Sequence, residues 1–301
     1  MDTMLVAHWY APEEVKEIAD YVGDSLGLIQ AVQKEQPKRL VFAGVRFMSE
    51  TAKVMLPDTE IIQPDFESTC SLVTQTNIDE LKKFRDDNQD STHVMYINSS
   101  VEMKVLADII VTSANVNAIV ENEIKNGNKV IFSPDKNMGT YINKEFGYDM
   151  KVFTSVCEVH DQFNVEYLKQ EMRSWTDGIK YVIAHPESPI DLLEMADFIG
   201  STNKMLEWVK NFPNKVGTIW VATEGGLIND MKKARPELDI RPALGYNGCQ
   251  CNQCPYMKRN TLEAVNAAMA GTGGTSIDYL TNDLIDAARK PIERMLNYTI
   301  E

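Results

Sequence analysis

Residues 4–10 of the chain read Met4-Leu5-Val6-Ala7-His8-Trp9-Tyr10, a short apolar run that leads directly into polar and aromatic side chains. Two later stretches have the same character, His93-Val94-Met95-Tyr96-Ile97-Asn98-Ser99 and Val182-Ile183-Ala184-His185-Pro186-Glu187. A short apolar run of this kind is typical of a buried strand in a parallel sheet. Because the pattern returns after roughly 90 residues, the sequence predicts three copies of one structural unit.

Each copy continues in the same order, first with a small hydroxyl residue and later with a cysteine. The hydroxyl follows the polar residue at the strand end by 17, 15 and 16 residues, and the cysteine follows the hydroxyl by 45, 44 and 53. These residues are His8, Ser25 and Cys70, then Asn98, Ser113 and Cys157, then His185, Ser201 and Cys254. Since ligands of parallel α/β units lie beyond the carboxyl ends of the strands, we expect all of these side chains around one cavity.

Amphipathic helical patterns lie between the apolar runs, among them those over 12–22, 116–126 and 165–174. This alternation predicts an α/β protein of three αβα sandwich units, related by pseudo-threefold symmetry, with parallel sheets around a central active site. We expect the units at 1–76, 77–163 and 164–282, with a C-terminal helix over 283–301 packing on the first unit. The segment Gly271-Thr272-Gly273-Gly274-Thr275 lacks the Gly-Lys-Ser/Thr of a phosphate-binding loop, so we interpret it as a flexible linker.

Composition limits the classes of partner. The 301 residues include 30 Lys and Arg against 44 Asp and Glu, which gives a net charge of −14. Such a charge disfavours nucleic acid and anionic membrane surfaces as partners, and no apolar run is long enough to span a bilayer. The N-terminus does not have the pattern of a signal peptide, and five cysteines in such a chain do not predict a disulfide framework. We therefore expect a soluble cytoplasmic protein that acts on small molecules.

Three cysteines at corresponding places in three units indicate a metal site. Each cysteine alone would be interpreted as a small buried side chain, but independent packing residues have no reason to recur at similar spacing. The run Cys249-x-Cys251-x2-Cys254-Pro255 partly matches the cluster-binding runs of bacterial ferredoxins. Zinc is the competing metal, with Cys251, Cys254 and two further ligands. An iron–sulfur cluster on three thiolates would leave one iron open, which suits dehydration chemistry.

The chain also resembles a known family, the quinolinate synthases, from about Leu5 to Leu296. The strongest block is Gly44-Val45-Arg46-Phe47-Met48-x-Glu50-Thr51-Ala52-Lys53, followed by Pro64-Asp65-x-Glu67-x2-Cys70-Ser71-Leu72. Shorter matches include Ala7-His8-x-Tyr10, Val22-Gly23-Asp24-Ser25-Leu26, Tyr96-x-Asn98-Ser99, Thr112-Ser113-x-Asn115, Cys157-x2-His160, His185-Pro186-Glu187, Gly200-Ser201-Thr202, Thr223-Glu224 and Cys254-Pro255-x-Met257. Most of these are weak alone, but their combined order is specific.

The resemblance implies three similar αβα domains around a central cavity and a role in NAD biosynthesis. The implied reaction condenses iminoaspartate with dihydroxyacetone phosphate to quinolinate, with loss of phosphate and two waters. The implied cofactor is a [4Fe–4S] cluster on Cys70, Cys157 and Cys254, whose open iron acts as a Lewis acid. Cys249 and Cys251 are then not cluster ligands, but either a redox-sensitive pair or reduced thiols. A functional link to the enzyme that supplies iminoaspartate is also implied.

The same resemblance assigns roles to residues at the strand ends. Glu187 is implied as the general acid and base and His185 as a substrate ligand and proton donor, with burial expected to move their pKa values toward neutrality. Tyr10 and Tyr96 are expected as catalytic phenol donors, and His160 as a donor to the cluster environment. The expected substrate-binding residues are His8, Ser25, Asn98, Ser113, Ser201 and Thr202. The four hydroxyl residues among them also suit helix N-caps, which is compatible with anion binding.

Two departures from the family and two other functions stay open. Trp9 and Ala11 replace residues that are often an amide or Tyr and a Gln, and we expect both to touch the cavity and to affect the fine placement of the substrate. One alternative function is a related enzyme that uses the same open-iron site for another condensation and dehydration of an amino-acid-derived substrate. The other is a non-enzymatic metal- or cluster-binding sensor that works through the run from Cys249 to Cys254.

Overall fold

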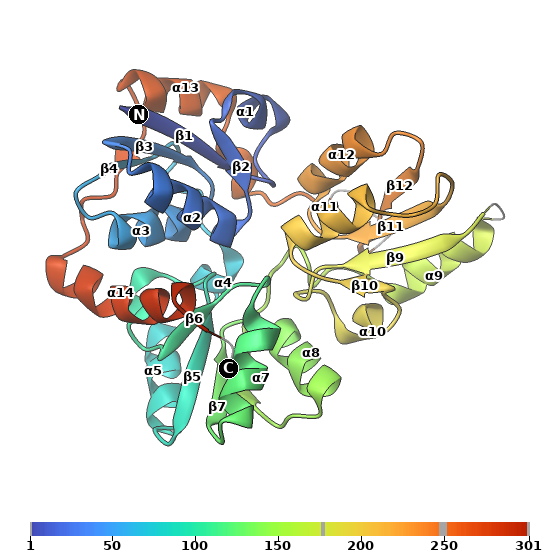
Figure 1. Cartoon of the computed structure of the whole chain (residues 1–301), viewed down its shortest axis with the longest axis horizontal. Helices are drawn as coiled ribbons and strands as arrows, with labels where there is room; N and C mark the ends of the chain where they lie inside the picture. Colours follow the sequence, from blue (N-terminus) through green and yellow to red (C-terminus); the bar gives the residue numbers. More distant parts are fainter. Residues whose placement is uncertain (1, 176–177, 247–251, 300–301) are drawn as a thin grey trace.

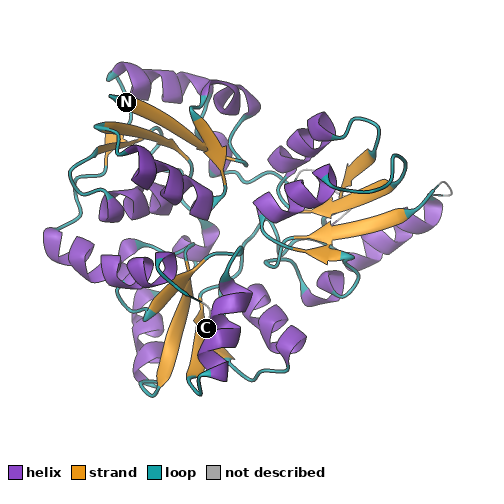
Figure 2. Cartoon of the chain, viewed as in Figure 1, coloured by secondary structure: helices purple, strands orange, loops and turns teal. Residues whose placement is uncertain are grey.

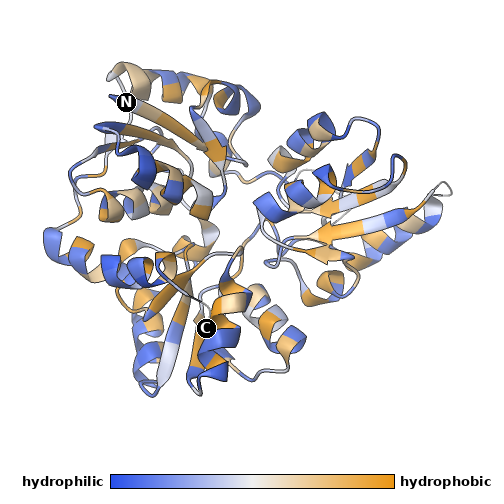
Figure 3. Ribbon diagram, viewed as in Figure 1, coloured by the Kyte–Doolittle hydropathy of each residue, from blue (hydrophilic) through white to orange (hydrophobic). Residues whose placement is uncertain are grey.

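The structure, a computed structural model, describes residues 2–175, 178–246 and 252–299. Three lobes surround a common centre (Figure 1), and in each lobe helices flank a sheet (Figure 2). The central strands are mostly hydrophobic, whereas the helices also carry hydrophilic residues (Figure 3). This arrangement confirms the predicted α/β class with repeated αβα units.

The first unit is built on four parallel strands in the order β4-β3-β1-β2. Its strands are β1 (Thr3–His8), β2 (Tyr21–Gly23), β3 (Arg39–Ala43) and β4 (Glu60–Gln63). Its helices are α1 (Glu13–Ile18), α2 (Ser25–Glu35), α3 (Arg46–Met55) and α4 (Ser71–Thr74).

The second and third units have their own parallel sheets, in the orders β6-β5-β7-β8 and β10-β9-β11-β12. The second unit contains α5 (Ile78–Asp86), β5 (Ser91–Tyr96), α6 (Val101–Lys104), β6 (Ile109–Val111), α7 (Val116–Lys125), β7 (Lys129–Ser133), α8 (Lys136–Phe146) and β8 (Lys151–Val152). The third contains α9 (Val165–Ser174), β9 (Lys180–Ala184), α10 (Ile190–Leu193), β10 (Phe198–Ile199), α11 (Thr202–Lys210), β11 (Thr218–Ala222), α12 (Gly225–Ala234) and β12 (Asp239–Pro242).

The three units share one strand order, and the register shows which residues correspond. In each unit the first strand pairs in parallel with the third, through Ala7 and Ala43, Met95 and Ser133, and Ala184 and Ala222. The next residues, His8, Tyr96 and His185, are therefore equivalent. Each of them precedes by 17 residues a hydroxyl residue, which is Ser25, Ser113 or Thr202. This corrects our pairing of the repeat, which used Asn98 and Ser201 in these places.

An aspartate in each unit ties the first strand to the second. Asp20 accepts a hydrogen bond from the Leu5 backbone N–H at 2.8 Å and donates its own N–H to the Leu5 carbonyl. Asp108 does the same with His93, and Asp197 with Val182. Because Asp20 makes these two hydrogen bonds with Leu5, the chain leaves the helix before this residue. The continuous helix that we predicted over 12–22 is therefore wrong: α1 ends at Ile18 and residues 21–23 form β2.

The C-terminal elements return to the first unit. Helix α13 (Leu262–Ala270) contacts β3, and β13 (Thr275–Ser276) pairs antiparallel with β4. The expected linker over 271–275 therefore leads into an edge strand, and these elements do not lie with the third unit, to which the range 164–282 assigned them. Helix α14 (Asn282–Leu296) contacts α3 of the first unit but also β6 and α6 of the second (Figure 1). The other unit boundaries stay predictions.

Buried aromatic side chains fill the sheets. Phe42 on β3, Phe132 on β7 and Trp220 on β11 are among the largest fully buried residues. Each such side chain stabilises the fold by about 1.5–3 kcal/mol relative to an exposed one. They belong to one cluster of packed residues that continues from unit to unit and supports the loops at the centre. Within the described ranges, none of the helices combines the length and the apolar character that crossing a bilayer requires.

Candidate active site

A central cavity is lined by residues from all three units. The loops that follow the carboxyl ends of the strands converge on the centre of the molecule (Figure 2). Twelve of the predicted site residues line the cavity: His8, Tyr10, Ser25, Cys70, Tyr96, Asn98, Ser113, Cys157, His185, Glu187, Thr202 and Cys254. Ser201, the remaining one, is fully buried and is the N-cap of α11, where its hydroxyl accepts the Lys204 backbone N–H.

The three cysteines reach the cavity from three different loops. Cys70 is the N-cap residue of α4, Cys157 follows β8, and Cys254 precedes the short 3-10 helix η2 (Met257–Arg259). All three are half-buried free thiols. Burial raises the pKa of each, for Cys254 to about 11, and Cys70 and Cys254 add to the rise at Cys157. The thiols therefore lie close enough together for their charges to interact.

Glu187 lies between two histidine rings. Its Oε2 atom is 3.0 Å from His160 Nδ1 and 3.1 Å from His185 Nδ1, and Asn98 donates to Oε1 at 3.4 Å. Burial alone would raise the pKa of Glu187, but the two rings lower it below its ordinary value. Burial also lowers the pKa of His185, although Glu187 opposes this shift. Glu187 is thus a carboxylate near neutral pH, rather than a group shifted toward neutrality as expected.

The equivalent histidine of the first unit is neutral. Burial, followed by the nearby His185 ring, lowers the pKa of His8 to about 3. Its Nδ1 atom accepts the backbone N–H of Tyr10 at 3.2 Å. In the third unit, His185 Nδ1 lies 3.5 Å from the backbone N–H of Glu187, which is the equivalent contact. With Nδ1 occupied as an acceptor, His8 has its remaining hydrogen on Nε2. The ring is held for donation at that atom.

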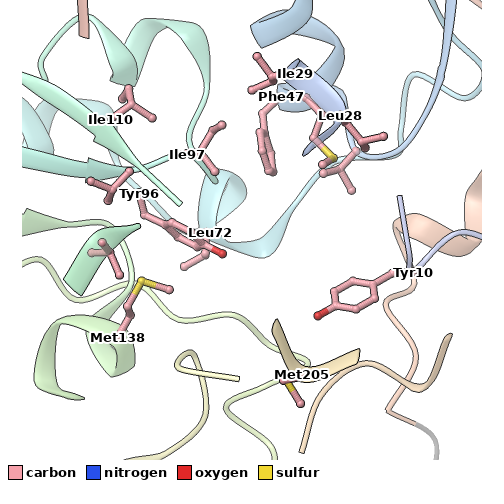
Figure 4. Packing of buried hydrophobic residues seen from close by; sticks show 14 of the residues in the cluster. Tyr10, Leu28, Ile29, Phe47, Leu72, Tyr96, Ile97, Ile110, Met138 and Met205 are labelled. Atoms are coloured by element: carbon pink, nitrogen blue, oxygen red, sulfur yellow. The ribbon is translucent and has the colours of Figure 1, made fainter. Parts of the chain in front are cut away.

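Two phenols enter the cavity from different units. Figure 4 shows the Tyr10 and Tyr96 rings approaching the same central region, with their hydroxyl oxygens directed inward. Burial raises the pKa of both phenols well above the ordinary value, so both stay protonated and can donate. The Tyr10 hydroxyl lies 2.8 Å from Thr223 Oγ1, and Thr223 Oγ1 lies 3.1 Å from His160 Nε2.

Hydroxyl residues lie at the beginning of two of the helices. Ser25 is the first residue of α2 and Thr202 the first residue of α11, whereas Ser113 lies in a turn before α7. The N-cap of α2 is Asp24, whose carboxylate accepts the Gly27 backbone N–H at 2.9 Å. Free N–H groups and the helix dipole favour an anion at such positions. These ends of α2 and α11 therefore offer anion-binding groups inside a protein of negative net charge.

Sequence reasoning did not single out the residues that hold this site together. Glu224 is fully buried, and its Oε1 atom accepts the Cys254 backbone N–H at 3.1 Å and lies 3.0 Å from Lys258 Nζ. Its Oε2 atom accepts the Gly226 N–H at the start of α12, and Lys258 also donates to the Tyr10 carbonyl at 2.7 Å. The only sequence signal was the pair Thr223-Glu224, which belongs to the family pattern but shows no chemistry by itself.

Two further predicted residues do not line the cavity, and two others lie outside the described residues. Neither Trp9 nor Ala11 is among the described residues that line the cavity, so the expectation that both touch it is wrong. The Trp9 indole donates to Asn203 Oδ1 at 2.5 Å, and Ala11 is buried in the core of the first unit because it packs beneath α13. Cys249 and Cys251 lie outside the described residues.

The donor atoms at the cavity suit a metal centre. Cys157 Sγ, one nitrogen of His160 and one carboxylate oxygen of Glu187 all lie within 4.8 Å of one another. His160 Nδ1 is 3.2 Å from Cys157 Sγ, which places an imidazole beside a potential thiolate ligand. Together with Cys70 and Cys254, these groups combine soft metal ligands with a proton acceptor.

Comparison with known proteins identifies the family. The family model described as quinolinate synthetase A protein matches residues 1–297. The quinolinate synthase of Microcystis aeruginosa is 38% identical over 296 residues, which cover 98% of this chain and 91% of that protein. The quinolinate synthases of Chloroherpeton thalassium and Cyanophora paradoxa are 39% and 38% identical, with 98% of this chain and 90% and 88% of theirs covered. This chain is therefore an enzyme of the quinolinate synthase family.

Proposed function

We propose that the chain condenses iminoaspartate with dihydroxyacetone phosphate to quinolinate, with loss of phosphate and two waters, as a step of NAD biosynthesis. The observation that carries this proposal is the meeting of Cys70, Cys157 and Cys254, one from each unit, on a cavity that also contains Glu187 and His185. Family membership supports the same reaction. The enzyme would act in the cytoplasm and depend on another enzyme for iminoaspartate.

We propose further that the three thiols hold a [4Fe–4S] cluster. The donor set fits this group, because iron–sulfur clusters take cysteine thiolates and the three thiols are close enough to influence one another. When bound, such a cluster supplies an iron without a protein ligand, which acts as a Lewis acid on a substrate oxygen. The remaining tasks of binding and proton transfer belong to the side chains around it.

Proton transfer is assigned to the group centred on Glu187. The condensation needs protons removed from carbon and nitrogen and delivered to departing oxygens. Glu187 is ionised and accepts protons at Oε2, while His185 is close enough to Oε2 to exchange a proton with it. Tyr10 and Tyr96, which stay protonated, donate to substrate oxygen atoms.

Substrate anions are assigned to the hydroxyl residues at the helix ends. Ser25 and Thr202 bind carboxylate or phosphate together with the N-terminal N–H groups of α2 and α11, and Ser113 adds a hydroxyl from the second unit. Asn98 orients Glu187 through its hydrogen bond to Oε1. The neutral His8 donates a hydrogen bond to the substrate without adding a positive charge. These local donors offset the repulsion expected from the net charge of −14.

The test is anaerobic purification with iron and sulfide analysis, followed by incubation with iminoaspartate and dihydroxyacetone phosphate. We expect a brown protein that forms quinolinate. Cys254→Ser is expected to lose the cluster, and Cys251→Ser, its matched control, to keep it. A colourless zinc protein would show that the cofactor is wrong. A brown protein that forms no quinolinate would favour a related condensation or a sensor instead.

A further inference from the structure

The lining of the cavity contains carboxyl groups but no strong cation. Asp24, Glu187 and Glu224 line it, whereas no lysine or arginine is among the described residues that do so. Both proposed substrates are anions. The hydroxyls and helix N–H groups assigned to them supply only partial positive charges, and these must overcome full negative charges nearby. A cation close to the cavity, but outside its lining, would favour the binding of such substrates.

Lys204 connects two of the segments that carry the predicted anion-binding hydroxyls. It lies in the first turn of α11, two residues after Thr202. Its Nζ atom donates a hydrogen bond at 2.7 Å to the carbonyl of Ala114, in the second unit. Ala114 directly follows Ser113, which lines the cavity. The Lys204 ammonium group is therefore placed between the hydroxyl residue of the third unit and that of the second.

The same turn of α11 also lies beside the beginning of α2 in the first unit. Asn203 accepts a hydrogen bond from the Trp9 indole at 2.5 Å, and a Cβ atom at Gly27 of α2 would lie 3.6 Å from Asn203 Nδ2. Burial raises the pKa of Asp24, the N-cap residue of α2, and the positive charge of Lys204 is among the influences that oppose this rise. The charge of Lys204 thus acts on all three segments.

The charge of Lys204 is available to a ligand. The Ala114 carbonyl is neutral and takes only one of the three ammonium hydrogens. Within the described ranges, no carboxylate forms an ion pair with Lys204. Lys210, at the end of the same helix, differs in this respect, because its Nζ lies 2.8 Å from Glu207 Oε1. These two lysines of α11 therefore provide a comparison between a charge facing the cavity region and a charge already paired.

We propose that Lys204 is a positioning residue that attracts the phosphate group of dihydroxyacetone phosphate to the hydroxyls of Ser25, Ser113 and Thr202. A phosphate monoester carries close to two negative charges and three acceptor oxygens, so it can use one donor from each unit. Lysine recognises phosphate as a point charge and does not need a fixed geometry. A carboxylate has one charge and two oxygens, and it gains less from this arrangement.

The inference rests on the proposed function, so its first test is independent of catalysis. Binding of inorganic phosphate to the anaerobically purified enzyme is measured by calorimetry at low ionic strength. We expect Lys204→Met to raise the Kd for phosphate about fivefold, the effect of one unit charge at about 4 Å in water, and Lys204→Arg to leave it within about twofold. Lys210→Met is the matched control and should also stay within about twofold. An unchanged Kd in Lys204→Met, or an equal rise in Lys210→Met, would overturn the proposal.

Salt separates the effect of charge from an effect of packing. In 1 M potassium chloride the screening length is only about 3 Å, so the difference in Kd between the wild-type enzyme and Lys204→Met should disappear. A difference that persists at this salt concentration would show that the variant alters the shape of the site, and would refute an electrostatic role for Lys204.

Steady-state kinetics connect phosphate binding with the substrate. In Lys204→Met the KM for dihydroxyacetone phosphate should rise about fivefold at low ionic strength, with kcat and the KM for iminoaspartate unchanged. A rise confined to iminoaspartate, or a fall in kcat alone, would contradict the assignment to the phosphate. If the wild-type enzyme forms no quinolinate, the proposed function fails, while phosphate calorimetry still decides whether Lys204 attracts this anion.

Discussion

Lys104 is a fully buried lysine whose ammonium group is held by backbone oxygens. Its Nζ atom donates to the Ile97 carbonyl at 2.8 Å and also to the Ser99 carbonyl, and it lies 5.2 Å from the centre of the Phe47 ring. Burial lowers the pKa of Lys104 to about 7, and the carboxylate of Glu50 opposes this shift. Because Ile97 and Ser99 flank Asn98, Lys104 fixes the loop that brings Asn98 to the cavity.

We predict that Lys104→Met destabilises the protein by about 1–3 kcal/mol, since the Ser99 carbonyl loses its donor while the Ile97 carbonyl keeps the Ser99 backbone N–H. Quinolinate formation should fall as well, because the Asn98 amide is no longer aimed at Glu187. Urea unfolding and kcat measure the two effects. The control is Lys82→Met on α5, where the side chain is 54% exposed and a change within about 0.5 kcal/mol is expected. Equal stability of the two variants would contradict the role given to Lys104.

His93 shows what a buried histidine outside the site does. Its Nδ1 lies 2.9 Å from the Leu106 carbonyl and its Nε2 2.7 Å from the Ser133 hydroxyl, so both nitrogens are satisfied by the core. Burial lowers the pKa of His93 to about 4, and the hydrogen bond to Leu106 opposes this shift only in part. His93 therefore has a structural role in the core of the second unit.

The pKa of His93 predicts a pH dependence of stability. Between pH 6.5 and about pH 4 the unfolded chain binds a proton here and the folded chain does not, so the free energy of unfolding falls as the pH falls. At about 1.4 kcal/mol per unit, the loss attributable to His93 is about 3 kcal/mol. The stability difference between the wild-type protein and His93→Gln should narrow by about this amount from pH 7 to pH 4 in urea unfolding. A constant difference would exclude the titration described.

At the scale of elements, the three quoted apolar runs predicted β1, β5 and β9, whereas no helical pattern was predicted over α2 or α8. Helices α2 and α8 contain Gly27 and Gly139, and glycine weakens a helical pattern. The reason for Gly139 is tertiary, because a Cβ atom there would lie 2.5 Å from Val152 on β8. A sequence does not reveal which chain will approach a glycine so closely. Short strands such as β2 were missed for a related reason, since their partners lie in other parts of the unit.

The candidate site was predictable where it follows the repeat. Equivalent loops deliver Cys70, Cys157 and Cys254 to one cavity. All but one of the predicted catalytic, substrate-binding and cluster residues line it, whereas Trp9 and Ala11 do not. The sequence did not predict the structural roles of Thr223, of Glu224 or of the aspartates that bind the first strand to the second. Their partners come from other strands or other units, so spacing along the chain does not show the contacts.

The edge strand β13 depends on a close approach at Gly274. Gly274 has φ of +81°, and a Cβ atom there would lie 2.5 Å from Ile62 Cγ2 on β4. We predict that Gly274→Ala costs about 2–5 kcal/mol, as the sum of left-handed backbone strain and overpacking. Gly127→Ala is the matched control, because Gly127 has φ of +84° with nothing within 4 Å and should cost only about 1–2 kcal/mol. Thermal or urea unfolding compares them, and equal losses would show that β13 does not pack as described.

At the scale of the whole molecule, buried polar contacts join the first and third units beside the cavity. Lys16 on α1 is buried, and its Nζ lies 2.5 Å from Asp230 Oδ2 on α12 and 3.3 Å from the Gly226 carbonyl. The Trp9 indole donates to Asn203 across the same boundary. The relative position of these two units determines whether the Tyr10 hydroxyl reaches Thr223. Contacts at the interface therefore also determine the geometry of the site.

We predict that Lys16→Met destabilises the protein by about 1.5–3 kcal/mol, because the half-buried carboxylate of Asp230 loses its charged hydrogen-bond donor. The double variant Lys16→Met/Asp230→Leu should recover most of this loss, since a buried ion pair replaced by apolar side chains is often close to neutral. Displacement of Tyr10 relative to Thr223 should also lower kcat/KM in the single variant, on the order of tenfold or more, with recovery in the double variant. Urea unfolding and steady-state kinetics of both proteins measure this. If the double variant is as unstable as the single one, the interface is stabilised by the packing of the Lys16 side chain and not by its ion pair with Asp230.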